Sequence, residues 1–397
     1  MPLRNLLLLA TCQMISASGS IAMVTLGGIV GTSLAANKAL ATLPVSMMVV
    51  SVALTAIPAT MLMRRVGRRT GFALAAIAAS LAWLLAGFAL WQQSFALFTL
   101  AGAVFGINMA FTQQYRYAAA ESVAPQFVGR AVSVVLLGAI GGAIVGSELV
   151  TRAADLFAAV PFAGTVLALA ALHLLQAALF TLLGPLRGEG DDAPRTGGRP
   201  LGEILRQPLF VVAVLGGTAA YGVMSLIMTA TPISMHVGDG HSLAETSSVI
   251  RSHVIAMYLP SLVSGFLIDR LGTVRLMAVG ALVLIGSCII GLQGQAVVHY
   301  LWALVLLGIG WNFLYVGGTT MLTLTYRLEE RFRAQAVNEF TVFGTSAAGS
   351  LLAATVVHLY GWTTLMLVPL PVLAVTLLGL FVVRRDPQVG RRRAAAA

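Results

Sequence analysis

Long apolar stretches alternate with short polar breaks along almost the whole chain. Each stretch is about 20 residues long or longer, the length of helix that crosses the hydrocarbon core of a bilayer. The pattern predicts twelve spans, at residues 5–33, 39–63, 70–91, 95–117, 131–153, 162–183, 208–235, 248–268, 276–295, 298–326, 336–358 and 363–383. Twelve such helices use roughly 240 residues. We therefore expect an all-α membrane protein with no large soluble domain.

One polar segment, 184–207, is longer than the other breaks and is rich in Gly, Pro and charged residues. A segment of this composition does not bury a hydrophobic core and acts as a flexible linker. It predicts an N-terminal six-helix bundle at 1–183, a cytoplasmic linker, and a C-terminal six-helix bundle at 208–383. A basic tail follows at 384–397.

The composition of the chain agrees with a protein built of membrane spans, and the distribution of its charged residues predicts how the spans are oriented in the membrane. The chain of 397 residues is 58% hydrophobic and 10% charged, with a net charge of +10, whereas soluble proteins carry about 25% charged residues. Of the 24 Lys and Arg residues, 21 fall on one side of the predicted spans. By the positive-inside rule this side is cytoplasmic. We therefore expect both termini on the cytoplasmic side of the inner membrane, and the positive charge requires no nucleic-acid partner.

The two predicted bundles are weakly similar in sequence at an offset of 204–205 residues. Gly-Ile-Asn at 106–108 in span four corresponds to Gly-Trp-Asn at 310–312 in span ten, and Arg-Val-Gly at 65–67 to Arg-Leu-Gly at 270–272. Internal repeats of this kind are found in many transporters. The matches indicate two halves that share one fold.

The loop after span eight carries the most specific motif, formed by Gly265, Asp269, Arg270 and Gly272. In this loop and in its overall architecture, the chain resembles the major facilitator superfamily of bacterial secondary transporters with twelve spans. The resemblance implies the major facilitator fold, in which two pseudo-symmetric six-helix halves alternate access to a central site.

The loop motif suggests a conformational latch on the cytoplasmic side. Asp269 can accept hydrogen bonds from a helix N-terminus or pair with an arginine of the other half. The alternative is a solvated loop pair with Arg270, worth about 0–1 kcal/mol. The corresponding loop after span two keeps Arg65, Gly67 and Arg68. Arg64 stands there at the acidic position, so we expect the two latches to differ.

Polar residues within spans are costly and generally face a cavity or another helix. The family resemblance implies that spans one, four, seven and ten line the cavity. The candidates for substrate binding are Gln13, Asn108, Thr112, Tyr115, Tyr221, Met228, Trp311, Asn312 and Tyr315. Amides, aromatic rings and methionine without a fixed charge suit a neutral or amphipathic, planar aromatic solute. The alternative is that these side chains only hold helices together.

Coupling to protons requires a group that titrates as access alternates, such as a buried carboxylate or a histidine. The candidates are Glu148, His253 and Glu339. Each has a structural alternative. Glu148 precedes Arg152 by four residues, a spacing that permits an ion pair. His253 lies at the outer end of its span, and Glu339 near a helix N-terminus, where a negative charge is favourable.

The direction of transport depends on weaker signals in span five. Gly138, Gly142 and Gly146 are four residues apart, which permits close packing against a partner helix. Exporters of the family end this glycine pattern in Gly-Pro, and here Ser147 replaces the proline. Efflux is therefore only mildly favoured, and uptake of a vitamin-like or metabolite-like compound is the alternative.

The sequence shows neither a nucleotide-binding loop nor the motif of a catalytic site. We therefore expect a proton-coupled secondary transporter, not an enzyme, that acts as a monomer in the lipid bilayer on a small molecule, without a cofactor or metal. The alternative function is a sensor or assembly factor that uses a transporter fold without moving a solute.

Overall fold

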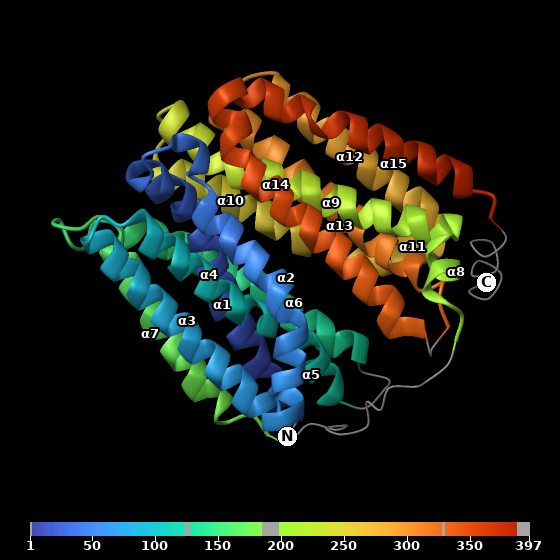
Figure 1. The fold of residues 1–397 in the computed structure, drawn as a ribbon, viewed down its shortest axis with the longest axis horizontal. Coiled ribbons are helices and arrows are strands. Elements are labelled where there is room, and N and C mark those ends of the chain that lie inside the picture. The colour runs from blue at the N-terminus through green and yellow to red at the C-terminus, as the bar shows by residue number, and fades with distance from the viewer. Residues whose placement is uncertain (1, 124–127, 185–197, 328–329, 387–397) are drawn as a thin grey trace. The chain divides into compact units, whose positions relative to one another are not determined.

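The computed structural model describes residues 2–123, 128–184, 198–327 and 330–386, which form helices and short connections with no β-strand among them (Figure 1). The first part contains α1 (Pro2–Leu34), η1 (Lys38–Leu40), α2 (Leu43–Val66), α3 (Arg68–Trp91), α4 (Phe95–Thr112), α5 (Tyr115–Glu121), α6 (Val128–Arg152) and α7 (Ala163–Phe180). The second contains α8 (Leu201–Leu205), α9 (Pro208–Pro232), η3 (Ile233–Gly238), α10 (Leu243–Tyr258), α11 (Ser261–Leu271), α12 (Thr273–Leu292), α13 (Val297–Leu322), α14 (Arg331–Leu367) and α15 (Pro369–Val383).

Ten helices in the described parts of the chain are long and apolar enough to cross a membrane, and α10 with α11, bent by 43°, make an eleventh candidate. The last candidate, Arg333–Val383, has 51 residues. At about 1.5 Å per residue it is more than twice as long as the hydrocarbon core is thick, about 30 Å. Gly361 interrupts it with φ 78°, and Figure 1 shows the chain reversing between α14 and α15. Counted as two spans, this stretch completes the predicted twelve.

Two compact units make up the chain. The first comprises Met1–Asp192 and Met228–Ile255, and the second comprises Ala193–Ile227 and Ala256–Ala397. The segment from Met228 to Ile255, which holds the end of α9, η3 and most of α10, therefore packs with α1–α7. Most of the predicted linker and most of the basic tail lie outside the described residues.

Two glycines one repeat apart have the same backbone conformation. Gly67 joins α2 to α3 with φ 81° and ψ 156°, and Gly272 joins α11 to α12 with φ 83° and ψ 154°. Each glycine amide donates to the fourth residue before it, Met63 or Ile268. Only glycine adopts such a positive φ without strain. The geometry agrees with the internal repeat that the sequence predicts.

The glycines of the predicted fifth span pack α6 directly on α1. A Cβ on Gly138 would lie 2.3 Å from the carbonyl oxygen of Ala10, and one on Gly146 would lie 2.6 Å from that of Ser18. Gly142 lies between them and faces Ala17 in the same way. The four-residue spacing puts all three on one helix face. The close packing predicted from this spacing is therefore confirmed, with α1 as the partner.

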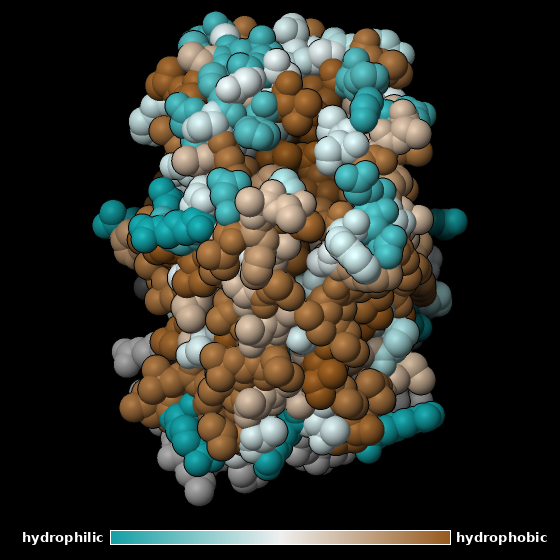
Figure 2. Space-filling model, turned by 90° about the vertical axis from the view of Figure 1, so that its left-hand side faces the viewer, coloured by the Kyte–Doolittle hydropathy of each residue, from teal (hydrophilic) through white to brown (hydrophobic). Residues whose placement is uncertain are grey.

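The surface of the protein is largely apolar. Large side chains such as Leu54 (72% exposed) and Val382 (73% exposed) stand free of the rest of the chain, and brown, hydrophobic residues cover much of the face in Figure 2. A water-soluble monomer rarely exposes apolar patches of this extent. Lipid chains accommodate them, while the backbone polar groups are bonded within the helices.

Candidate functional site

The first unit brings together three of the predicted binding residues in its interior. Asn108 and Thr112 of α4 are 0% and 4% exposed, and Tyr115 at the start of α5 is 0% exposed. The Ser16 hydroxyl of α1 lies 3.4 Å from the Asn108 side-chain nitrogen and 3.1 Å from Thr112 Oγ1. Gln176 of α7 donates to Ser16 Oγ at 2.8 Å, to Tyr115 Oη at 3.2 Å and to the Cys12 carbonyl at 2.8 Å.

This buried polar cluster connects four helices, so it holds α1, α4, α5 and α7 together. The side-chain amide oxygens of Asn108 and Gln176 have no hydrogen-bond partner in the described structure. Gln13 and Met228, also predicted as binding residues, are half-buried and lie outside the cluster. Met228 packs against the apolar core of the first unit.

The second unit brings together Tyr221 of α9 with Trp311 and Tyr315 of α13. The ring of Tyr221 meets those of Trp311 and Tyr315 edge-on, with centroids 5.2 and 5.0 Å apart. Trp311 and Tyr315 stack at 5.1 Å with their planes 20° apart. Phe343 of α14 packs edge-on against Tyr221 at 5.4 Å. We call these four residues the aromatic cluster.

Small residues allow the three helices of the aromatic cluster to approach one another. A Cβ on Gly318 of α13 would lie 3.0 Å from the Ala213 carbonyl of α9, and one on Gly349 of α14 would lie 2.7 Å from the Gly222 carbonyl. Trp311 is 4% exposed, whereas Tyr221, Tyr315 and Phe343 are half-buried. The cluster therefore has a buried base and a more open rim.

Asn312, next to Trp311, has a different position. Its side-chain nitrogen donates to the Met257 carbonyl at 2.8 Å and to Ser261 Oγ at 2.6 Å, and its oxygen accepts from Ser264 at 2.6 Å. These residues surround the break between α10 and α11, where Pro260 has no backbone N–H to continue the helix. The Asn312 amide thus provides hydrogen-bond partners for the backbone and side-chain polar groups that the helix break leaves unpaired. Polar groups within a membrane need such partners, because no water is available to them.

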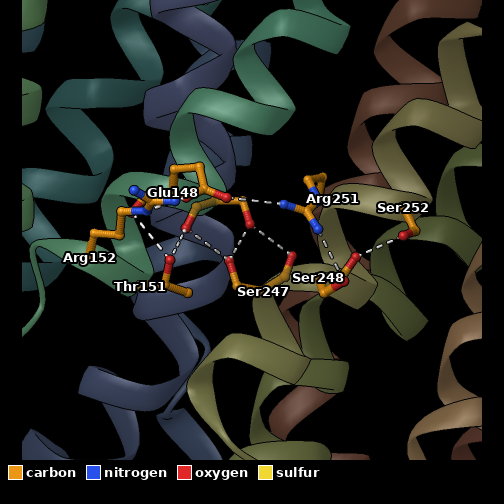
Figure 3. Close-up of polar contacts among 8 residues, drawn as sticks. Glu148, Thr151, Arg152, Ser247, Ser248, Arg251 and Ser252 are labelled. Carbon is orange, nitrogen blue, oxygen red and sulfur yellow. Dashed lines mark hydrogen bonds and ion pairs between the residues drawn. The ribbon is translucent and has the colours of Figure 1, made fainter.

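Glu148 of α6 lies in a polar network with α10, within the first unit (Figure 3). Arg152 and Arg251 approach its carboxylate from opposite sides, at 2.6 and 3.4 Å. The neighbouring Ser147 hydroxyl lies 2.8 Å from that of Ser247. The Glu148 side chain is 40% exposed, so each ion pair contributes about 0–1 kcal/mol to stability. The spacing of Glu148 and Arg152 thus correctly indicated an ion pair, and Arg251 joins it.

The other two coupling candidates differ from each other in burial and in the unit that holds them. His253 is fully buried on α10, and Glu339 is exposed near the start of α14, in the second unit. In the loop motif, Asp269 is exposed and Arg270 lies over the Phe266 ring at 5.0 Å.

The glycine and arginines of the predicted latch also have defined surroundings. A Cβ on Gly265 would meet no atom within 4 Å in the described part of the chain. In the first loop, Arg65 is exposed and Arg68 forms an ion pair with Glu121.

A further ion pair lies within the second unit, between Arg199 and Glu330. Arg199 donates to both oxygens of Glu330, at 2.9 and 2.7 Å, and to the Thr325 carbonyl at 2.9 Å. The Glu330 side chain is 0% exposed. The Arg199 guanidinium and the backbone amides around the carboxylate hold the pKa of Glu330 well below its usual range. The pair ties the residues before α8 to the loop between α13 and α14.

The family model of the Major Facilitator Superfamily matches residues 6–250 and 224–397, which together span nearly the whole chain. The chain belongs to the major facilitator superfamily. Among curated proteins it is similar to the riboflavin transporter RfnT of Brucella anthropi, with 39% identity over 97% of this chain and 96% of the relative. The uncharacterized MFS-type transporter YdeG of Bacillus subtilis is 29% identical over 89% of this chain and 86% of its own.

Solved structures of the superfamily have the same fold. An inward-facing, unoccupied bacterial homologue of the human lysosomal transporter Spinster matches with a TM-score of 0.76 and 15% identity, over 98% of each chain. The nucleoside transporter NupG matches with a TM-score of 0.70 and 14% identity, over 96% of this chain and 99% of its own. The protein is thus a major facilitator transporter and not an enzyme, as the sequence analysis predicted.

Sequence reasoning missed two residues that the major facilitator fold brings to these clusters. Gln176 places a side-chain amide within an apolar span. Burying an amide in the membrane costs free energy, so this residue alone was a signal for a buried polar contact. Phe343 gave no signal, because a phenylalanine in an apolar helix is indistinguishable from one that faces lipid. Only the packing of α14 against α9 reveals its contact with Tyr221.

Proposed function

We propose that this major facilitator transporter carries riboflavin, or a close relative of it, into the cell by alternating access. The observation that supports this most strongly is the 39% identity to a riboflavin transporter over almost the full length of both chains. The vitamin-uptake alternative of the sequence analysis therefore takes precedence over efflux. The neutral aromatic and amide side chains in the spans are compatible with an uncharged, planar solute.

The test is uptake of labelled riboflavin by bacterial cells that cannot synthesise it. Cells expressing the chain should accumulate the label and grow on low external riboflavin, whereas cells with an empty vector should not. An unlabelled excess of riboflavin should abolish the signal, and an excess of a sugar should not. Equal accumulation in both strains, with the protein present in the membrane, would rule out riboflavin uptake.

We also propose that protons drive the cycle, with Glu148, His253 and Glu339 as the candidates for the coupling group. The ion pairs of Glu148 with Arg152 and Arg251 are the structural alternative to a coupling role, so mutagenesis has to separate the two. Uptake should therefore be compared with and without a pH gradient in Glu148→Gln, His253→Ala and Glu339→Gln. The variant that lacks the coupling group should show uptake that depends less on the gradient. If all three variants keep the full dependence, none of these groups couples transport to protons.

A further inference from the structure

The aromatic cluster contains a hydrogen-bond donor that the protein leaves unused. Trp311 is 4% exposed, and its indole N–H has no acceptor in the described structure. An indole N–H can only donate, and a buried one usually has a partner. Leaving such a donor unpaired costs free energy, because its hydrogen bond to water is lost and not replaced. A bound molecule with an acceptor in the right place would recover this free energy.

Other buried tryptophans show how the protein treats this group elsewhere. Trp362, in the same unit, donates its N–H to the Gly291 carbonyl at 3.0 Å. Trp83 also lacks a partner for its N–H, but its ring packs in the core of the first unit against the rings of Phe105 and His173, which are both fully buried. Trp311 differs from both, because the rings of Tyr221 and Tyr315 that pack against its own ring are only half-buried.

We propose that the aromatic cluster is the site for a planar heteroaromatic ring, and that Trp311 Nε1–H donates to an acceptor on the edge of that ring. The inference rests on the proposed function and deepens it. The stacked rings of Trp311 and Tyr315 offer a flat face, Tyr221 meets both of them edge-on, and Phe343 packs edge-on against Tyr221. Stacked and edge-on contacts are the arrangements that aromatic rings prefer.

The tricyclic ring of riboflavin fits this chemistry. It is flat and uncharged, and it carries carbonyl oxygens and ring nitrogens that accept hydrogen bonds along one edge. Its sugar-alcohol chain has no flat aromatic face that could stack on the rings of the cluster. The cluster should therefore recognise the ring alone. Phe343, which the sequence did not single out, becomes a residue that determines specificity.

The experiment is equilibrium binding to the purified full-length chain in detergent, followed by quenching of flavin fluorescence. The probes are riboflavin, lumichrome (a tricyclic relative of its ring without the sugar-alcohol chain) and ribitol as a competitor. Trp311→Phe removes the N–H but keeps an aromatic ring, and Phe343→Leu removes a ring on another helix. Trp302→Phe is the matched control, because Trp302 lies on the same helix α13 and is 53% exposed. Thermal unfolding confirms that each variant is folded.

The wild type should bind both riboflavin and lumichrome, and ribitol should not compete. Trp311→Phe should raise both dissociation constants by about three- to tenfold, the effect expected from the loss of one hydrogen bond. Phe343→Leu should raise them by about two- to tenfold, and Trp302→Phe should leave them unchanged.

If riboflavin binds and is transported while both cluster variants keep wild-type dissociation constants, the ring lies elsewhere and the inference is wrong. It is also wrong if lumichrome does not bind or if ribitol competes. If the wild type neither binds nor transports riboflavin, the proposed function fails, and the inference fails with it.

Discussion

Two asparagines at equivalent positions of the repeat have different roles. Asn312 forms three hydrogen bonds with polar groups at the break between α10 and α11. The Asn108 side-chain nitrogen makes one long contact to Ser16, and its side-chain oxygen has no partner among the described residues. Each asparagine lies two residues after a glycine, and the difference between their roles comes from the helix that each one faces. The partner of Asn312 has a proline at its break, whereas Asn108 faces a continuous α1.

Asn312→Ala should therefore reduce the stability of the protein. It leaves the Met257 carbonyl and the Ser264 hydroxyl without this partner, and we expect a loss of about 1–3 kcal/mol. The measurement is the thermal unfolding midpoint in detergent. Asn338→Ala is the control, because the side-chain amide of that half-buried residue forms no hydrogen bond with the described residues. Equal midpoints for the two variants would contradict the role of Asn312 at the break.

At the scale of the helix, glycine spacing decides which elements touch. The glycines of α6 remove the side chains that would separate it from α1, so backbone and small side chains meet directly. The same residue type has no such role at Gly344 of α14, where a Cβ would meet no atom within 4 Å. Glycine in a helix that needs no close approach costs stability relative to alanine.

The same substitution should therefore have opposite effects at two glycines. Gly142→Ala places a Cβ 2.4 Å from that of Ala17 and should destabilise the protein by about 1–3 kcal/mol. Gly344→Ala meets no neighbour and should stabilise it by up to about 1 kcal/mol. Thermal unfolding of the two variants beside the wild type measures both. A loss at Gly344 or a gain at Gly142 would contradict the packing described.

The ion pair between Arg199 and Glu330, next to α8, should make the stability of the protein depend on pH. The pKa of Glu330 is lower in the folded protein than in the unfolded chain, where it is about 4.3. The ion pair with Arg199 therefore contributes fully above that value, and its contribution is lost as the pH falls below about 4.3. Glu330→Gln should lower the unfolding midpoint at pH 7. The difference from the wild type should shrink as the pH falls below 4.3, and a constant difference would contradict this.

At the scale of the whole molecule, the basic residues predict the direction of insertion. They gather in the breaks that hold the loop motifs and in both terminal segments, and the positive-inside rule assigns these to the cytoplasm. The two native cysteines, Cys12 and Cys288, are both buried. They should react slowly with an impermeant maleimide, so single introduced cysteines can report which side of the membrane they occupy.

Ala36→Cys and Arg275→Cys test this orientation. Both positions are exposed, Ala36 beside η1 and Arg275 on α12. In intact cells the impermeant reagent should label the variant at 36 and not the one at 275. After the cells are opened, both should be labelled. The reverse pattern in intact cells would place the termini outside the cytoplasm.

The sequence by itself determined the fold class, because span length, the internal repeat and the loop motif can all be recognised without knowing which helices touch. It also identified the close packing of span five, since four-residue glycine spacing specifies one helix face. The ion pair of Glu148 with Arg152 followed from spacing in the same way.

The tertiary structure decided which of the polar and aromatic candidates meet. It placed Asn108, Thr112 and Tyr115 in a core with Gln176, whereas it placed Asn312 at a helix break. It gathered Tyr221, Trp311 and Tyr315 and added Phe343. The physical reason is that these contacts join helices far apart in the sequence. Local periodicity fixes the face of a side chain, and only the packing of the other helices fixes what that face meets.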